Sequence, residues 1–134
     1  MALSANQPRD YQVGINEAYP LAAGAEIFEG SAVGENGAGY ARPLQAGDKF
    51  LGFAIFPVNN TGGGAGAERV ELKTSGRVRL NVLTSSISSN ARPAVYAIDD
   101  EVFTLVQGSN SVIGYVSRWV SGTECIVEFD ARGV

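Results

Sequence analysis

Glycine is spread through the whole chain and limits how long any regular element can be. The 134 residues include 17 glycines and 5 prolines, so few long windows lack both. An average α-helix needs about 11–12 residues, and glycine or proline in its interior destabilises it. Short strands joined by frequent turns fit this spacing better than helices do. The chain therefore predicts an all-β fold.

Alternating apolar and polar residues mark several of the expected strands. The pattern is strict in 70–74 and in 77–82 and recurs less strictly in 124–129, which is typical of strands with one face on a core and the other in water. A turn is expected between the first two of these strands, at Ser75-Gly76. The most apolar run, 50–58, indicates a fully buried strand that ends at its proline, since proline donates no hydrogen bond to a ladder.

Turn residues and two ambiguous windows complete the assignment. The dipeptide Asn36-Gly37 predicts a hairpin. Residues 95–105 have apolar positions at helical spacing, but their β-branched and aromatic residues and the turn-forming Asp99-Asp100 favour two strands. Residues 80–87 also have helical spacing, but the neighbouring serines favour a loop.

The chain is long enough for one domain, and its start differs from the rest. Roughly eight to ten short strands in residues 21–134 predict a single small β-barrel or sandwich. Residues 1–20 predict an extended N-terminal arm with period-two alternation, which can add a strand to a neighbouring sheet or pair within its own domain. Both alternatives remain open at this point. The candidate partner-binding residues of the arm are Tyr11, Val13, Ile15 and Tyr19.

Composition excludes several classes of function. The chain has no histidine, which removes Ser-His-Asp and Cys-His nucleophile systems and the usual histidine-ligated metal sites. Its net charge is −4 and its ten basic residues are scattered, so we expect no nucleic-acid partner. No stretch approaches the ~18 apolar residues of a membrane-spanning helix, and the first residues do not resemble a signal peptide. We therefore expect no membrane partner and synthesis in a cytoplasm.

No motif predicts catalysis, a cofactor or a metal. Gly62, Gly64 and Ala67 match a dinucleotide fingerprint in spacing, but the residues that follow read as a strand and supply no helix N-terminus for a pyrophosphate. The acidic run 99–101 could ligate a hard cation, although solvating a turn is the simpler interpretation. Cys125 is expected to be a small core residue rather than a reactive thiol. We therefore expect no enzyme.

The order of the short segments resembles a known group of proteins. A strand at 25–33 and a hairpin precede the apolar Leu51-Gly52-Phe53-Ala54, and a glycine-rich loop leads to the alternating strands. After a serine-rich link come Pro93-Ala94-Val95-Tyr96, then 112–116 and a last strand at 125–129. Over roughly residues 20–130 this resembles the capsid cement, or decoration, proteins of tailed bacteriophages. The resemblance rests on order and composition, and no binding residue transfers individually.

The resemblance implies a β-tulip-like barrel that sits on the outer surface of an HK97-type capsid in the virion and stabilises the shell. Its partners would be the major capsid protein and further copies of itself, as a homodimer or homotrimer, and it would be made in the host bacterial cytoplasm. The alternative function is a β binding module of a virion or surface, recognising a carbohydrate or a receptor. Trp119, Tyr115 and Tyr96 motivate that alternative, since aromatic rings can stack on sugars, although a lone tryptophan is more often core or interface.

Overall fold

The computed structural model describes residues 5–6 and 15–131. Within these residues the chain forms twelve strands and one short 3-10 helix. The first seven strands are β1 (Asn16–Pro20), β2 (Glu26–Ile27), β3 (Ala32–Glu35), β4 (Ala41–Pro43), β5 (Lys49–Ala54), β6 (Val58–Asn59) and β7 (Arg69–Lys73). The remaining elements are β8 (Ser75–Leu83), the helix η1 (Ile87–Ala91), β9 (Ala94–Ala97), β10 (Phe103–Thr104), β11 (Ser111–Ser121) and β12 (Glu124–Asp130). The expected all-β fold is confirmed.

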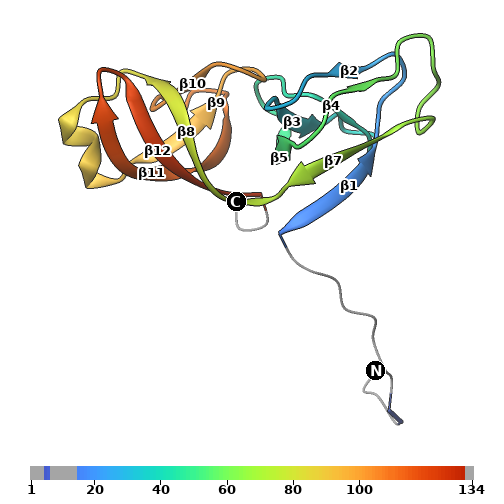
Figure 1. Cartoon of the computed structure of the whole chain (residues 1–134), viewed down its shortest axis with the longest axis horizontal. Helices are drawn as coiled ribbons and strands as arrows, with labels where there is room; N and C mark the ends of the chain where they lie inside the picture. Colours follow the sequence, from blue (N-terminus) through green and yellow to red (C-terminus); the bar gives the residue numbers. More distant parts are fainter. Residues whose placement is uncertain (1–4, 7–14, 132–134) are drawn as a thin grey trace.

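The strands form two β units that lie side by side (Figure 1). The first unit is a five-stranded sheet in the order β1-β7-β5-β3-β4, accompanied by the two-stranded ribbon β2-β6. The second is a closed barrel in the order β10-β8-β12-β11-β9, in which β10 runs parallel to β8 and the other neighbouring strands are antiparallel. The domain is thus a barrel with a sheet attached.

The chain passes from the sheet to the barrel without reversing. The expected turn at Ser75-Gly76 is wrong, because β7 ends at Lys73 and β8 begins at Ser75, where it pairs with Asp130 of the barrel. Gly76 has a φ of +145°, a conformation that side chains rarely adopt, and it lies inside β8. This glycine therefore lies where the chain passes from one unit to the other, and it does not form a hairpin turn.

One hydrophobic core spans both units. Phe50 and Phe53 of β5 pack edge-on against Phe129 of β12, with ring centroids 6.3 and 4.9 Å apart. Phe53 also lies 6.0 Å from Phe103 of β10. A second, smaller cluster fills the sheet unit alone; its buried members are Leu21, Ile27, Val33, Ala41, Leu51, Ala54, Val70 and Leu72. Sheet and barrel are therefore joined by packed aromatic rings as well as by the chain.

Most expected strands are confirmed, and two are split: the expected strand at 25–33 is divided between β2 and β3. Residues 94–104 form two strands rather than a helix, and the alternating residues of β8 and β12 face the core as expected. The apolar run 50–58 is split, because β5 ends at Ala54 and the chain bends before Val58 pairs with Ile27 in the ribbon. The serine-rich link contains η1, a single 3-10 turn. The described residues form no helix long and apolar enough to cross a membrane.

Candidate interaction surfaces

The C-terminal part of the predicted arm is a strand of the sheet. Asn16–Pro20 form β1, which pairs antiparallel with β7 of the same chain, so this part of the arm follows the second of the two alternatives. Tyr11 and Val13 lie outside the described residues. Ile15 is 47% exposed, whereas Tyr19 packs against the small core cluster. Of the two described candidates, Ile15 alone presents an exposed apolar side chain.

A cavity of about 500 Å³ lies where the sheet unit meets the barrel. Its polar lining includes the carboxylates of Glu29, Asp100 and Glu101, and its apolar lining comes from Phe28, Leu80 and Phe103. Arg79 also lines it but is paired with Glu124, at 3.2 Å. No sequence pattern indicated this cavity, because its walls come from three separate segments of the chain, 28–31, 79–81 and 100–103.

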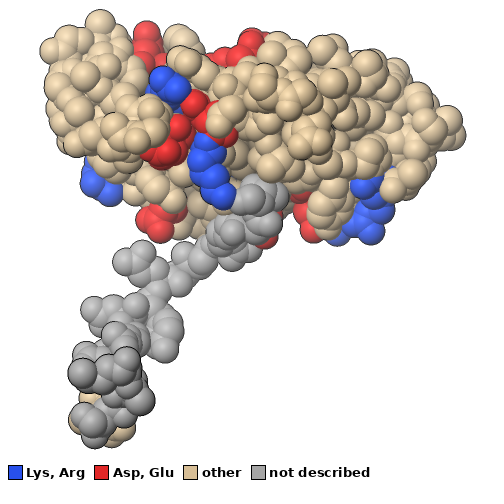
Figure 2. All heavy atoms as spheres, turned by 180° about the vertical axis from the view of Figure 1, so that it is seen from behind, with Lys and Arg blue, Asp and Glu red and all other residues tan. Residues whose placement is uncertain are grey.

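Two large aromatic side chains are exposed near one end of the ribbon. Ile27 pairs with Val58, which places Phe28 and Phe56 on neighbouring segments. Phe28 is 63% exposed and Phe56 is 57% exposed. On the face seen from behind, many charged side chains gather left of centre, and a further blue and red group lies along the lower edge toward the right (Figure 2). The surface thus combines groups of charged side chains with apolar and uncharged regions.

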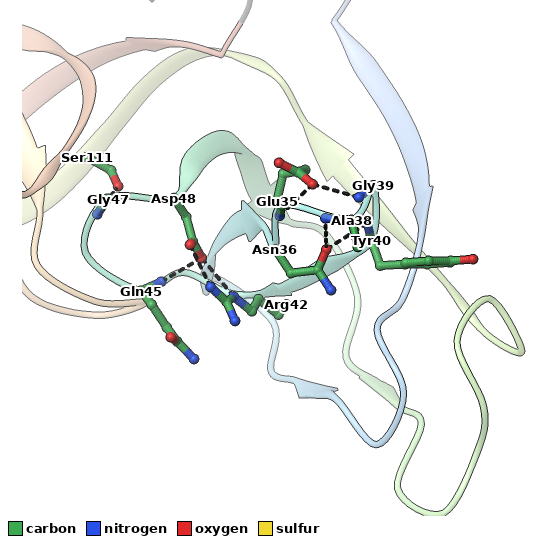
Figure 3. A network of polar contacts seen from close by, with 11 residues as sticks. Glu35, Asn36, Ala38, Gly39, Tyr40, Arg42, Gln45, Gly47, Asp48 and Ser111 are labelled. Carbon is green, nitrogen blue, oxygen red and sulfur yellow. Dashed lines mark hydrogen bonds and ion pairs between the residues drawn. The ribbon is translucent and has the colours of Figure 1, made fainter.

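A polar network fixes the turns between β3, β4 and β5 (Figure 3). Arg42 donates from Nε and Nη2 to the two carboxylate oxygens of Asp48, at 3.0 and 2.8 Å, and the Asp48 side chain is only 8% exposed. Asp48 also accepts a hydrogen bond from the backbone N–H of Gln45. In the same turn the N–H of Gly47 donates to Oγ of Ser111, on barrel strand β11. The network is therefore a structural brace that also ties the sheet to the barrel.

A row of interacting side chains crosses the outside of the barrel. Arg77 donates from Nε to Glu128 at 3.0 Å, and the Tyr115 hydroxyl donates to the other oxygen of Glu128 at 2.6 Å. Arg92 lies over the Tyr115 ring, 4.8 Å from its centroid. The hydrogen bond from Tyr115 and that from Arg77 lower the pKa of Glu128, and the carboxylate in turn raises the pKa of Tyr115. These contacts link β8, β12 and β11 across the outer surface of the barrel.

The acidic run 99–101 forms a turn, as the simpler interpretation predicted. Oδ1 of Asp99 accepts hydrogen bonds from the N–H groups of Glu101 and Val102, at 2.8 and 2.7 Å. Burial raises the pKa of Asp100, and the charges of Asp99 and Glu101 raise it further. Within residues 5–6 and 15–131 no group of three acidic, Cys or His side chains is placed to hold a metal ion.

The glycine-rich loop is organised by one buried amide. Asn60 donates from Nδ2 to the carbonyls of Ala22 and Gly64, both at 3.0 Å, and its side chain lies against Gly63. The loop continues into strand β7, so the expectation that no helix follows it is confirmed. The fingerprint spacing therefore reflects a turn that Asn60 holds in place.

The remaining candidate residues have structural contacts. Cys125 is fully buried in the barrel core, which confirms that prediction. Trp119 packs against the same core and donates from Nε1 to the carbonyl of Gly122. Tyr115 is hydrogen-bonded to Glu128 on the outer surface of the barrel. Trp119 and Tyr115 therefore each contact different residues.

Comparison of this chain with protein-family models, with curated proteins and with solved structures finds no match.

Proposed function

We propose that this chain is a structural protein that binds the outer surface of a bacteriophage capsid of the HK97 type and stabilises the shell. The proposal starts from the resemblance in segment order to capsid cement proteins. Its partners are the major capsid protein and further copies of the chain, and it acts in the virion without catalysis. The observation that carries it is the position of β1: the strand lies at the edge of the sheet and is preceded directly by the alternating segment of the arm.

A cement protein needs a body that keeps its shape and a segment that reaches a neighbour. The shared aromatic core and the brace around Asp48 support the first requirement, because both join sheet to barrel. The arm supports the second, since an extended segment that alternates apolar and polar residues can add a strand to another sheet. The net charge of −4 suits a position outside the shell, away from packaged DNA.

Co-sedimentation with undecorated capsids of the source phage tests the proposal directly. Saturable binding at a fixed ratio to the shell protein is expected, together with a higher temperature of capsid disruption. Failure to bind expanded shells would refute the proposal.

Deletion of the arm tests the role of its first part. The deletion must stop at residue 14, because Asn16–Pro20 belong to the sheet. The truncated chain is expected to keep its melting temperature and to bind capsids at least about tenfold more weakly, which corresponds to about 1.4 kcal/mol. The control replaces Phe56, an exposed apolar residue that follows β5, by Ser. Equal capsid binding by the truncated and full-length chains would remove the arm from the proposal.

A further inference from the structure

The edge of β1 offers few free backbone groups, although β1 is the outermost strand of the sheet. The N–H of Thr74 donates to the carbonyl of Ile15, and the N–H of Leu21 donates to the carbonyl of Glu68. In an antiparallel pair these bonded positions alternate with positions whose backbone groups point the other way. The backbone groups of Asn16, Ala18 and Pro20 therefore point away from β7, toward the open side of the sheet.

Side chains occupy the two central groups of this edge. The N–H of Ala18 donates to Oε1 of Glu17 at 3.1 Å. The carbonyl of Ala18 accepts a hydrogen bond from Nη2 of Arg69, also at 3.1 Å. Arg69 stands on β7 opposite Pro20, so its guanidinium reaches across β1 to the far side of the strand. Pro20 itself has no N–H to offer.

We propose that Glu17 and Arg69 are edge caps that keep β1 from pairing with β1 of a second copy of this chain. An uncapped edge strand is a template for another strand, and natural sheets block such edges with charged side chains and proline. The inference does not depend on the capsid role. The excluded partner is a second copy of the chain, because β1 is complementary to itself in one antiparallel register.

That register places Ala18 on a two-fold axis. Ala18 would then exchange two hydrogen bonds with its counterpart, and the N–H of Asn16 would donate to the carbonyl of Pro20 in the other copy. The missing N–H of Pro20 removes one bond on each side without leaving a buried donor unpaired. Glu17 would face Tyr19 of the other copy rather than its own counterpart, so no like charges would oppose each other directly. The Glu17 and Arg69 side chains occupy the bonds at the centre of this pairing.

The test removes both caps and measures association. In the full-length chain, the double variant Glu17→Ala, Arg69→Ala is expected to pair with a second copy of itself through β1. The protein concentration at which this occurs is expected to be at least tenfold lower than the concentration that the parent chain needs. Sedimentation velocity over a concentration series measures this, and hydrogen exchange should show new protection at the amides of Asn16 and Ala18. Both replaced side chains are exposed, so the melting temperature is expected to stay close to that of the parent.

Two variants keep the test specific. The control Arg79→Ala, Glu124→Ala removes the same pair of charges from the closed barrel, where no edge exists, and should associate as the parent does. Adding Ala18→Pro to the uncapped variant removes the N–H at the centre of the pairing and should restore the parent's behaviour. If the uncapped variant associates no more than the barrel control, or if the added proline fails to reverse its association, the proposal is wrong.

Discussion

Replacing Phe53 by Ala removes the ring that joins the sheet to the barrel. Its centroid lies 5.4 Å from that of Phe50 in the sheet, and 4.9 and 6.0 Å from those of Phe129 and Phe103 in the barrel. The residue is buried, at 8% exposure. Both units therefore lose packing at once when this side chain is truncated.

The expected loss of stability is large for a chain of this size. Truncating a buried phenylalanine costs about 3–5 kcal/mol, part of which reflects the cavity left behind. The entropy of unfolding of a 134-residue chain is about 0.28 kcal/mol/K near 60 °C. A loss of about 4 kcal/mol thus corresponds to a melting temperature about 14 °C lower. Single domains are stable by only about 5–15 kcal/mol, so we expect the variant to fold with a much smaller free energy of unfolding.

Urea denaturation of the parent and of two variants measures the effect. The matched control is Phe56→Ala, which removes the same ring from a position that is 57% exposed and is expected to cost under about 1 kcal/mol. Tryptophan fluorescence reports on Trp119 in the barrel, and far-ultraviolet circular dichroism reports on all strands. The two signals should change together in the parent, because one core spans both units.

Two results would refute this reasoning. If Phe53→Ala costs no more than Phe56→Ala, the aromatic cluster does not join the units energetically. If the parent unfolds in two separate transitions, the sheet and the barrel are independent domains.

Three further predictions concern single contacts. Asn60→Ala should cost about 1–3 kcal/mol in urea denaturation, since it leaves two loop carbonyls without their donor. Gly114→Ala should abolish the native circular dichroism spectrum, because a Cβ at this position would clash with the carbonyl oxygen of Glu128. Glu128 has a lowered pKa in the folded state, so its stabilising effect is present above about pH 4.5 and is lost as the pH falls through that lowered pKa. Tyr115→Phe should therefore weaken the acid-side fall in melting temperature measured across a pH series.

Local alternation predicted the strands that have one buried face. In β7, β8 and β12 the side chains alternate because one face of each strand is buried, so the pattern can be read from neighbouring residues alone. Gly76 misled the interpretation, because a glycine beside a serine favours a turn by composition. With a φ of +145°, Gly76 lies inside a strand that continues without reversing. Whether the chain continues or turns here depends on β12, whose Asp130 pairs with Ser75.

The surfaces could not be predicted in the same way, since they depend on which strands become neighbours. Arg77 and Glu128 meet only because β8 lies next to β12, 51 residues along the chain. Ile15 and Tyr19 share a side of the alternation, yet Tyr19 lies opposite Val70 and packs inward, while Ile15 stays exposed just before the first residue of the strand. Pairing order is set by long-range packing, and a single sequence does not display it.

The distribution of sheet edges restricts how copies or partners can be joined through backbone contacts. The barrel is closed and offers no edge. In the sheet, Leu21 bridges to Ala41 and the N–H of Ala22 donates to the Ala41 carbonyl, which covers the first residue of the edge strand β4. The other edge, β1, has its centre capped by Glu17 and Arg69. Strand addition is thus opposed at the barrel and at the centre of β1, and we expect the segment before Ile15 to be the one that donates a strand.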